Sequence, residues 1–183
     1  MVLEVIRYNS VLSFLLGAVL STASCQSDVS ENVKQLNAGN GDRLEITDTC
    51  TVNGVFFELL QNPVSDKAEL RIASEKVARR GKINLSPPCY FLREDGNLQT
   101  YSYPEIGIER TLIILGDTVG AAKKKYFGFD DKDDFSRICG MGIQGILIKK
   151  DSVILTNKAL TAGFRCVDPG TDEKDFWDFA HNR

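Results

Sequence analysis

The first segment of the chain that is rich in β-branched side chains alternates apolar and polar residues. Residues 44–52 follow this alternation, Asn53 and Gly54 interrupt it, and residues 55–60 form a second apolar run. An Asn-Gly pair supplies the positive φ angles that a type I′ turn requires. The pattern therefore predicts an opening β-hairpin, with a short helix over residues 55–60 as the alternative.

Residues 66–80 carry two competing patterns. Acidic residues precede basic residues along the segment and Gly81 follows it, so the charges match the dipole of a helix that Gly81 ends. The apolar residues at 68, 70 and 72 alternate with charged residues, which is the pattern of an amphipathic strand. We favour a helix over residues 66–80 and keep the strand as the alternative.

From residue 82 onward, short apolar runs are separated by Pro, Gly, Asp and Asn, which is typical of an antiparallel meander. The runs cover residues 83–85, 89–93, 98–103, 110–115, 143–149 and 153–156. Residues 94–97 and 149–152 have the composition of hairpin turns, and residues 168–180 predict a short closing helix. The expected fold is α+β: an antiparallel β-sheet or small open barrel with one central helix and a short C-terminal helix.

The apolar run near the N-terminus predicts export. Residues 11–20 are too few for the roughly 20 apolar residues of a membrane helix, and they fit the roughly 7 to 15 of a signal peptide. Small residues Ala23 and Ser24 followed by Cys25 resemble the bacterial lipoprotein signal, in which the Cys is acylated. This resemblance implies removal of residues 1–24 and a lipid on Cys25. Cleavage after Ala23 with plain secretion is the alternative.

The polar composition continues to residue 43. Residues 25–43 contain few apolar side chains, so they bury too little surface to offset their ordering entropy. They are expected to form a tether between a lipid anchor and a folded part. Residues 44–183 have the length of a single domain, which we expect to lie outside the cytoplasm, anchored to a membrane of the bacterial envelope.

The cysteines agree with an oxidising compartment. Apart from Cys25, the chain contains Cys50, Cys89, Cys139 and Cys166. They include no Cys-x-x-Cys pair, and the single histidine is His181, so disulfides are favoured over a zinc site. Sequence leaves three connectivities open. We prefer Cys139 with Cys166, which bracket a predicted hairpin, and therefore Cys50 with Cys89.

The charge distribution gives no indication of nucleic acid binding. The net charge is −3, and the basic residues are scattered except at 123–125. Binding to a polyanion requires a basic field over a whole face, so residues 123–125 are expected to form a solvated loop. Nucleic acid is not an expected partner.

Other candidate motifs favour structural roles. The glycines at 140, 142 and 145 spell G-x-G-x-x-G, but an apolar run follows where a dinucleotide site needs a helix, so they predict close backbone approaches in a strand. The acidic residues of 130–134 lack the spacing of a calcium loop and predict a solvated turn. Cys89 and His181 are not expected to act as nucleophile and base, because exported cysteines are normally oxidised. We predict neither a cofactor nor a metal site.

Tyr101 and Tyr103 are the candidate partner-binding residues. They are two positions apart, so they share one face of a strand. Exposed aromatic residues are frequent anchors of protein interfaces, whereas the same pair would belong to the core if this face were covered. Other aromatic residues stand at 90, 91, 126, 127 and 129.

The absence of a recognisable catalytic motif favours a non-catalytic binding module. We expect an exported, lipid-anchored envelope protein that binds a protein or another envelope ligand as an inhibitor, immunity or assembly factor. The alternative is a hydrolase of envelope polymer that uses paired carboxylates, for which Glu94, Asp95 and Glu105 are candidates. A purely structural envelope component is a third possibility.

Overall fold

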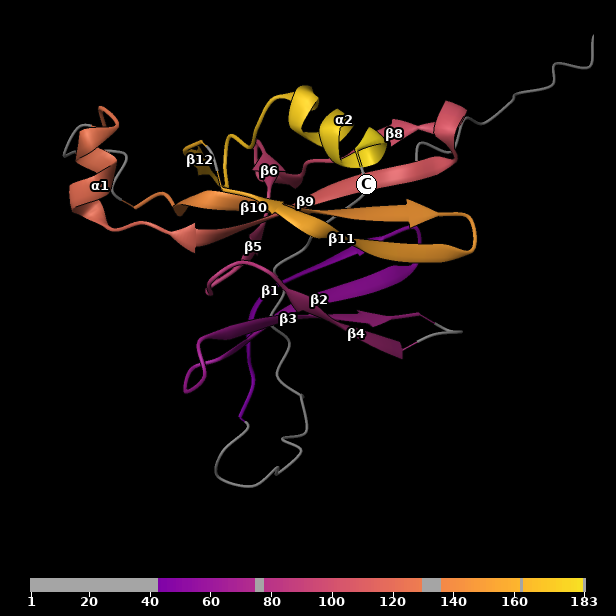
Figure 1. Ribbon diagram of the computed structural model, residues 1–183, viewed down its shortest axis with the longest axis horizontal. Helices are drawn as coiled ribbons and strands as arrows, with labels where there is room; N and C mark the ends of the chain where they lie inside the picture. Colours follow the sequence, from indigo (N-terminus) through magenta and orange to yellow (C-terminus); the bar gives the residue numbers. More distant parts are fainter. Residues whose placement is uncertain (1–42, 75–77, 130–135, 162, 183) are drawn as a thin grey trace, which may run out of the picture.

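The computed structural model describes residues 43–74, 78–129, 136–161 and 163–182, which form three layers (Figure 1). A four-stranded antiparallel sheet forms one outer layer, and a six-stranded antiparallel sheet forms the middle layer. Helix α2 (Glu173–His181) covers the other face of the middle sheet, and helix α1 (Ala121–Tyr126) protrudes from one end of that sheet.

The four-stranded sheet is built from consecutive hairpins. Its strands, in spatial order, are β1 (Glu45–Val52), β2 (Val55–Asn62), β3 (Lys67–Ala73) and β4 (Ala78–Ile83). Asn53 and Gly54 make the first turn with φ angles of 51° and 74°. The predicted opening hairpin is therefore confirmed, and the alternative of a helix over residues 55–60 is wrong.

The predicted central helix over residues 66–80 is wrong, because its described residues belong to β3 and β4. Ala68, Leu70 and Ile72 all point into the core from β3. A helix would have spread these alternate positions around its circumference, whereas a strand buries all three on one face. Burial of the apolar side chains outweighs the helix-like order of the charges.

The middle sheet has the order β11-β10-β9-β5, with β12 paired to β10 and β8 paired to β9. Its strands are β5 (Tyr90–Phe91), β8 (Tyr101–Tyr103), β9 (Ile108–Thr118), β10 (Cys139–Lys149), β11 (Ser152–Leu160) and β12 (Arg165–Cys166). A separate hairpin pairs β6 (Arg93–Glu94) with β7 (Asn97–Leu98), and a 3-10 helix, η1 (Pro104–Ile106), precedes β9. The hairpin turns predicted at 94–97 and 149–152 are confirmed.

The central strand β9 is buried on both faces. Leu112 and Ile114 pack into the core between the two sheets, and Ile113 and Leu115 pack into the core under α2. Because successive residues of a strand point to opposite faces, a strand covered on both sides needs apolar residues at every position. The unbroken apolar run of β9 therefore follows from its place in the middle layer.

Helix α2 lies within the predicted C-terminal segment and packs closely on β10. The side chain of Asp172 caps the helix by accepting a hydrogen bond of 2.8 Å from the Lys174 amide. A Cβ at Gly145 would lie only 2.6 Å from the ring of Phe179. The G-x-G-x-x-G glycines thus lie within a strand, and the predicted close approach is confirmed at Gly145.

The fold of the described residues is α+β, consisting mostly of antiparallel sheet with two α-helices, one of them short. The two sheets are not closed into a barrel. Instead, a polar seam joins them beside β1. The Asp48 carboxylate receives two hydrogen bonds from the Arg93 guanidinium, at 2.8 and 2.7 Å, and one of 2.8 Å from the Phe91 amide. The Thr47 hydroxyl donates to the Cys89 carbonyl at 2.7 Å.

Candidate functional site

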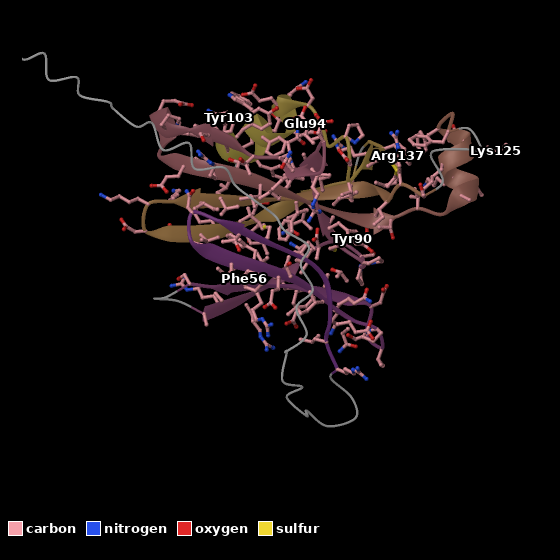
Figure 2. All side chains as sticks on the ribbon, turned by 180° about the vertical axis from the view of Figure 1, so that it is seen from behind. Phe56, Tyr90, Glu94, Tyr103, Lys125 and Arg137 are labelled. Carbon is pink, nitrogen blue, oxygen red and sulfur yellow. A yellow bond between two sulfur atoms is a disulfide. The ribbon has the colours of Figure 1, made fainter. Side chains whose placement is uncertain are left out.

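Tyr101 and Tyr103, the predicted partner-binding pair, lie beneath α2. The ring of Tyr101 is 4.7 Å from that of Phe176, and Tyr103 is 5% exposed, with its hydroxyl 3.5 Å from the Glu173 carbonyl (Figure 2). Burial and then the Glu173 charge raise the pKa of Tyr103 to about 12. Tyr103 therefore belongs to the core, and Tyr101 is half-buried against it, so α2 covers most of this face of β8.

The cysteines follow the prediction for one pair. Cys139 and Cys166 lie directly opposite each other on β10 and β12 and form a disulfide, which confirms that pairing. The structure contains no disulfide between Cys50 and Cys89, which are both buried. Cys50 points into the core opposite Phe57, whereas Cys89 packs against Gly116 of β9. The candidate lipidation site, Cys25, lies outside the described residues.

Cys89 is not brought together with His181. Cys89 belongs to the core between the two sheets, whereas His181 stacks on Trp177 at the end of α2, on the other face of the middle sheet. Burial and then the charge of Asp117 raise the pKa of the Cys89 thiol to about 12. A thiol of this kind stays protonated at neutral pH and is a poor nucleophile.

Three carboxylates with little solvent exposure form ion pairs with arginine. Asp48 pairs with Arg93, Glu58 pairs with Arg71, and Asp175 pairs with Arg165. Glu94, Asp95 and Glu105, the hydrolase candidates, are exposed. Neither the groove at Ile138 nor the hollow between β11 and α2 is lined by two carboxylates, and within the described part of the chain no group of three metal-ligating side chains is found. The acidic residues of 130–134 lie outside that part.

Two exposed aromatic residues lie next to each other at the protruding end of the molecule. Tyr126 and Phe127 at the end of α1 are 83% and 38% exposed, and Ile138, just before β10, is 40% exposed. Phe129 and Phe164 lie beside them and are half-buried. We call these five residues the α1 surface.

The rings of the α1 surface hold one another in place. Phe127 stacks on Phe164 with the ring centres 4.5 Å apart, and Phe129 meets the edge of Phe164 at 5.1 Å. Tyr126 packs edge-on against Phe127 at 5.3 Å. Packed aromatic pairs prefer these offset and edge-to-face arrangements. The rings of the α1 surface therefore support one another through direct contacts.

Phe164 is anchored by the residues that follow it. Cys166 is joined covalently to Cys139, and the Arg165 guanidinium makes two hydrogen bonds to Asp175, at 2.6 and 2.8 Å. The disulfide thus fixes the segment that contains Phe164 to the start of β10. Removal of either anchor should loosen the ring on which Phe127 and Phe129 pack.

An open groove of about 240 Å³ shares Ile138 with the α1 surface. Its lining combines apolar, hydroxyl and basic side chains: Pro88, Tyr90, Thr118, Val119, Lys124, Ser136, Arg137, Ile138 and Cys139. The Lys124 side chain of α1 is buried, and its ammonium group donates a hydrogen bond to the Arg137 carbonyl. Burial, followed by the charge of Asp48, raises the pKa of the Tyr90 phenol. In Figure 2, Tyr90 and Arg137 lie in the same half of the molecule as Lys125 of α1.

The sequence did not predict α1 or its aromatic cluster. Residues 123–125 were expected in a loop, but they belong to a six-residue helix without a side-chain cap. The available signal was the concentration of aromatic residues at 126–129, directly after three lysines. The contribution of Phe164 has no local signal, because it depends on how β10, β11 and β12 pair.

No protein family model, curated protein or solved structure matches this chain. Among the described residues, no helix combines the length and apolar character needed to cross a lipid bilayer.

Proposed function

We propose that this chain is an exported, lipid-anchored envelope protein that acts as a non-catalytic binding module, as an inhibitor, immunity or assembly factor. It binds a partner protein through the α1 surface. The observation that carries this proposal is the pair of exposed rings Tyr126 and Phe127, which pack with the half-buried Phe129 and Phe164 at the protruding end of the molecule.

The composition of the α1 surface suits a protein partner. Aromatic residues dominate the energetic centres of protein interfaces because they bury a large area with few rotatable bonds. The neighbouring groove offers a place for a side chain of the partner, and Lys123 and Lys125 supply an exposed polar rim. Because the rings are already packed together, binding would lose little additional side-chain entropy.

Export and lipid anchoring are supported by the sequence around Cys25 and by the Cys139–Cys166 disulfide, since structural disulfides persist mainly in oxidising compartments. Mass spectrometry of the mature protein from its native cells tests this part. The proposal predicts an N-terminal Cys25 carrying acyl chains. An N-terminus at Ser24 would indicate plain secretion, and a chain that retains residues 1–24 would refute export.

Replacement of exposed rings tests the binding part. We expect the double variant Tyr126→Ala, Phe127→Ala to bind the partner from envelope fractions at least about tenfold more weakly than wild type. Aromatic residues at interfaces often contribute about 2 kcal/mol or more, and about 1.4 kcal/mol corresponds to a factor of ten in affinity. Val64→Ala is the matched control, because Val64 is as exposed as Tyr126 and lies far along the chain in the β2–β3 turn. Equal retention by all variants would exclude the α1 surface as the binding site.

A further inference from the structure

The four-stranded sheet has one covered edge and one open edge. Beside β1, Thr47 and Asp48 bond to the segment that contains Cys89 and Phe91. At the opposite edge, β4 pairs with β3, and among the described residues no backbone hydrogen bond joins its other side to a neighbour. Ala78, Arg79, Arg80 and Lys82 of β4 are exposed.

The open edge is strongly basic in a chain whose net charge is −3. The described residues of β3 and β4 carry a single carboxylate, Glu69, and five basic side chains: Lys67, Arg71, Arg79, Arg80 and Lys82. Residues 75–77 do not alter this balance, since they contain one Glu and one Lys. The charge of this edge is therefore opposite in sign to that of the whole chain.

A row of charged side chains crosses the sheet and ends with Arg80 at the open edge. Glu58, Arg71 and Arg80 lie directly opposite one another on β2, β3 and β4. Glu58 forms an ion pair with Arg71, but Arg71 and Arg80 place like charges side by side, which destabilises a strand pair. The contact of Arg80 with Glu69 is 3.9 Å long and exposed, so it offsets little of this repulsion. A carboxylate beyond Arg80 would give each arginine of the row an acidic neighbour, Glu58 for Arg71 and the added carboxylate for Arg80.

We propose that the β4 edge accepts an extended acidic segment of a partner protein as a fifth strand of this sheet. The backbone groups of β4 supply the ladder of hydrogen bonds, and carboxylates of the incoming strand pair with Arg80 and Lys82. Charged residues on an edge strand also discourage uncontrolled pairing between copies of a protein. Here the charge has one sign, so it excludes a second copy of β4 while favouring an acidic strand. This surface lies on the other sheet from the α1 surface, and its test is independent of that proposal.

The test uses the mature chain and a synthetic peptide of alternating Glu and Val with blocked ends. We expect saturable binding by calorimetry at low salt, with slower hydrogen exchange at the amides of residues 79–82. A peptide of the same charge, N-methylated at alternate residues, should bind about tenfold more weakly because it cannot form the ladder. Arg80→Glu should weaken binding to a similar extent, whereas Lys150→Glu, the same type of charge reversal at the β10–β11 turn, should leave it unchanged.

Three results would overturn the proposal. The first is no saturable binding of the acidic peptide. The second is equal affinity for the N-methylated peptide, which would reduce the interaction to charge attraction. The third is an equal loss in Arg80→Glu and Lys150→Glu, which would assign the effect to net charge and not to the β4 edge.

Discussion

At the scale of single residues, the polar groups that the fold buries are held by specific partners. Asp48 illustrates this, because its two carboxylate oxygens accept three hydrogen bonds from Arg93 and Phe91. Its side chain is 12% exposed and that of Arg93 is 19% exposed. A charge at this depth is tolerated only when it is paired.

Asp48→Asn should therefore be strongly destabilising. The substitution leaves the Arg93 charge without its carboxylate in the seam between the two sheets, and such losses cost about 3 to 5 kcal/mol. Glu69→Gln is the matched control, because it breaks an exposed pair worth about 1 kcal/mol or less. Chemical denaturation of both variants measures the difference, and equal losses would show that the seam is not a main link between the sheets.

The buried thiol of Cys89 predicts a loss of stability in alkali. Its pKa rises from 9.0 to about 12 on folding, chiefly through burial. A raised pKa means that the stabilising contribution is complete below pH 9 and is lost as the pH rises toward 12, by about 1.4 kcal/mol per pH unit. Tyr103, with a pKa also raised to about 12, adds to the loss above pH 10. Unfolding free energies of wild type and Cys89→Ala, measured from pH 8 to 11, should converge as the pH rises; a constant difference would contradict this account.

At the scale of elements, alternation of apolar residues was the reliable signal. It located most of the strands and the hairpin turns, including the one at Asn53 and Gly54. In β3 the alternation was also present, but the order of the charges led to the wrong prediction of a helix. The two-sided burial of β9 was not predicted, because it depends on a second layer that the local sequence does not reveal. Helix α1 was missed because six residues give no periodicity.

The contact between α2 and β10 gives a prediction at this scale. Gly145→Ala places a methyl group 2.6 Å from the ring of Phe179, so α2 must move, at a cost of about 1 to 3 kcal/mol. Gly120→Ala, where a Cβ meets nothing within 4 Å, should change stability much less. Phe179→Leu should recover part of the Gly145→Ala loss in a double-mutant cycle, and purely additive losses would contradict the proposed contact.

At the scale of the whole molecule, the candidate site depends on contacts that bring distant segments together. The sequence predicted the Cys139–Cys166 disulfide, which anchors the site, but it assigned partner binding to Tyr101 and Tyr103. Those residues proved to be covered by α2. No local pattern distinguishes a covered sheet face from an open one, because the distinction lies in where α2 docks. For the same reason, the meeting of Phe127 with Phe164 was not predictable.

Loss of the disulfide should weaken both the domain and the site. The crosslinked residues are 27 positions apart, so the chain-entropy model gives about 3 to 4 kcal/mol for the crosslink. Cys139→Ala with Cys166→Ala should therefore lower the free energy of unfolding by this amount. It should also reduce partner binding under conditions where the domain stays folded, because Phe164 loses an anchor. Full binding by the folded variant would show that the α1 surface does not need this support.

Site-specific photocrosslinking in the native cells is the most direct test of partner binding by the α1 surface. Benzoylphenylalanine placed at position 126 preserves an aromatic side chain on the α1 surface, and the same group at position 64 is the equally exposed control. We expect one discrete protein adduct from position 126, formed outside the cytoplasm and absent from position 64. No adduct at 126, or the same set of adducts at both positions, would contradict the claim that this surface binds a partner.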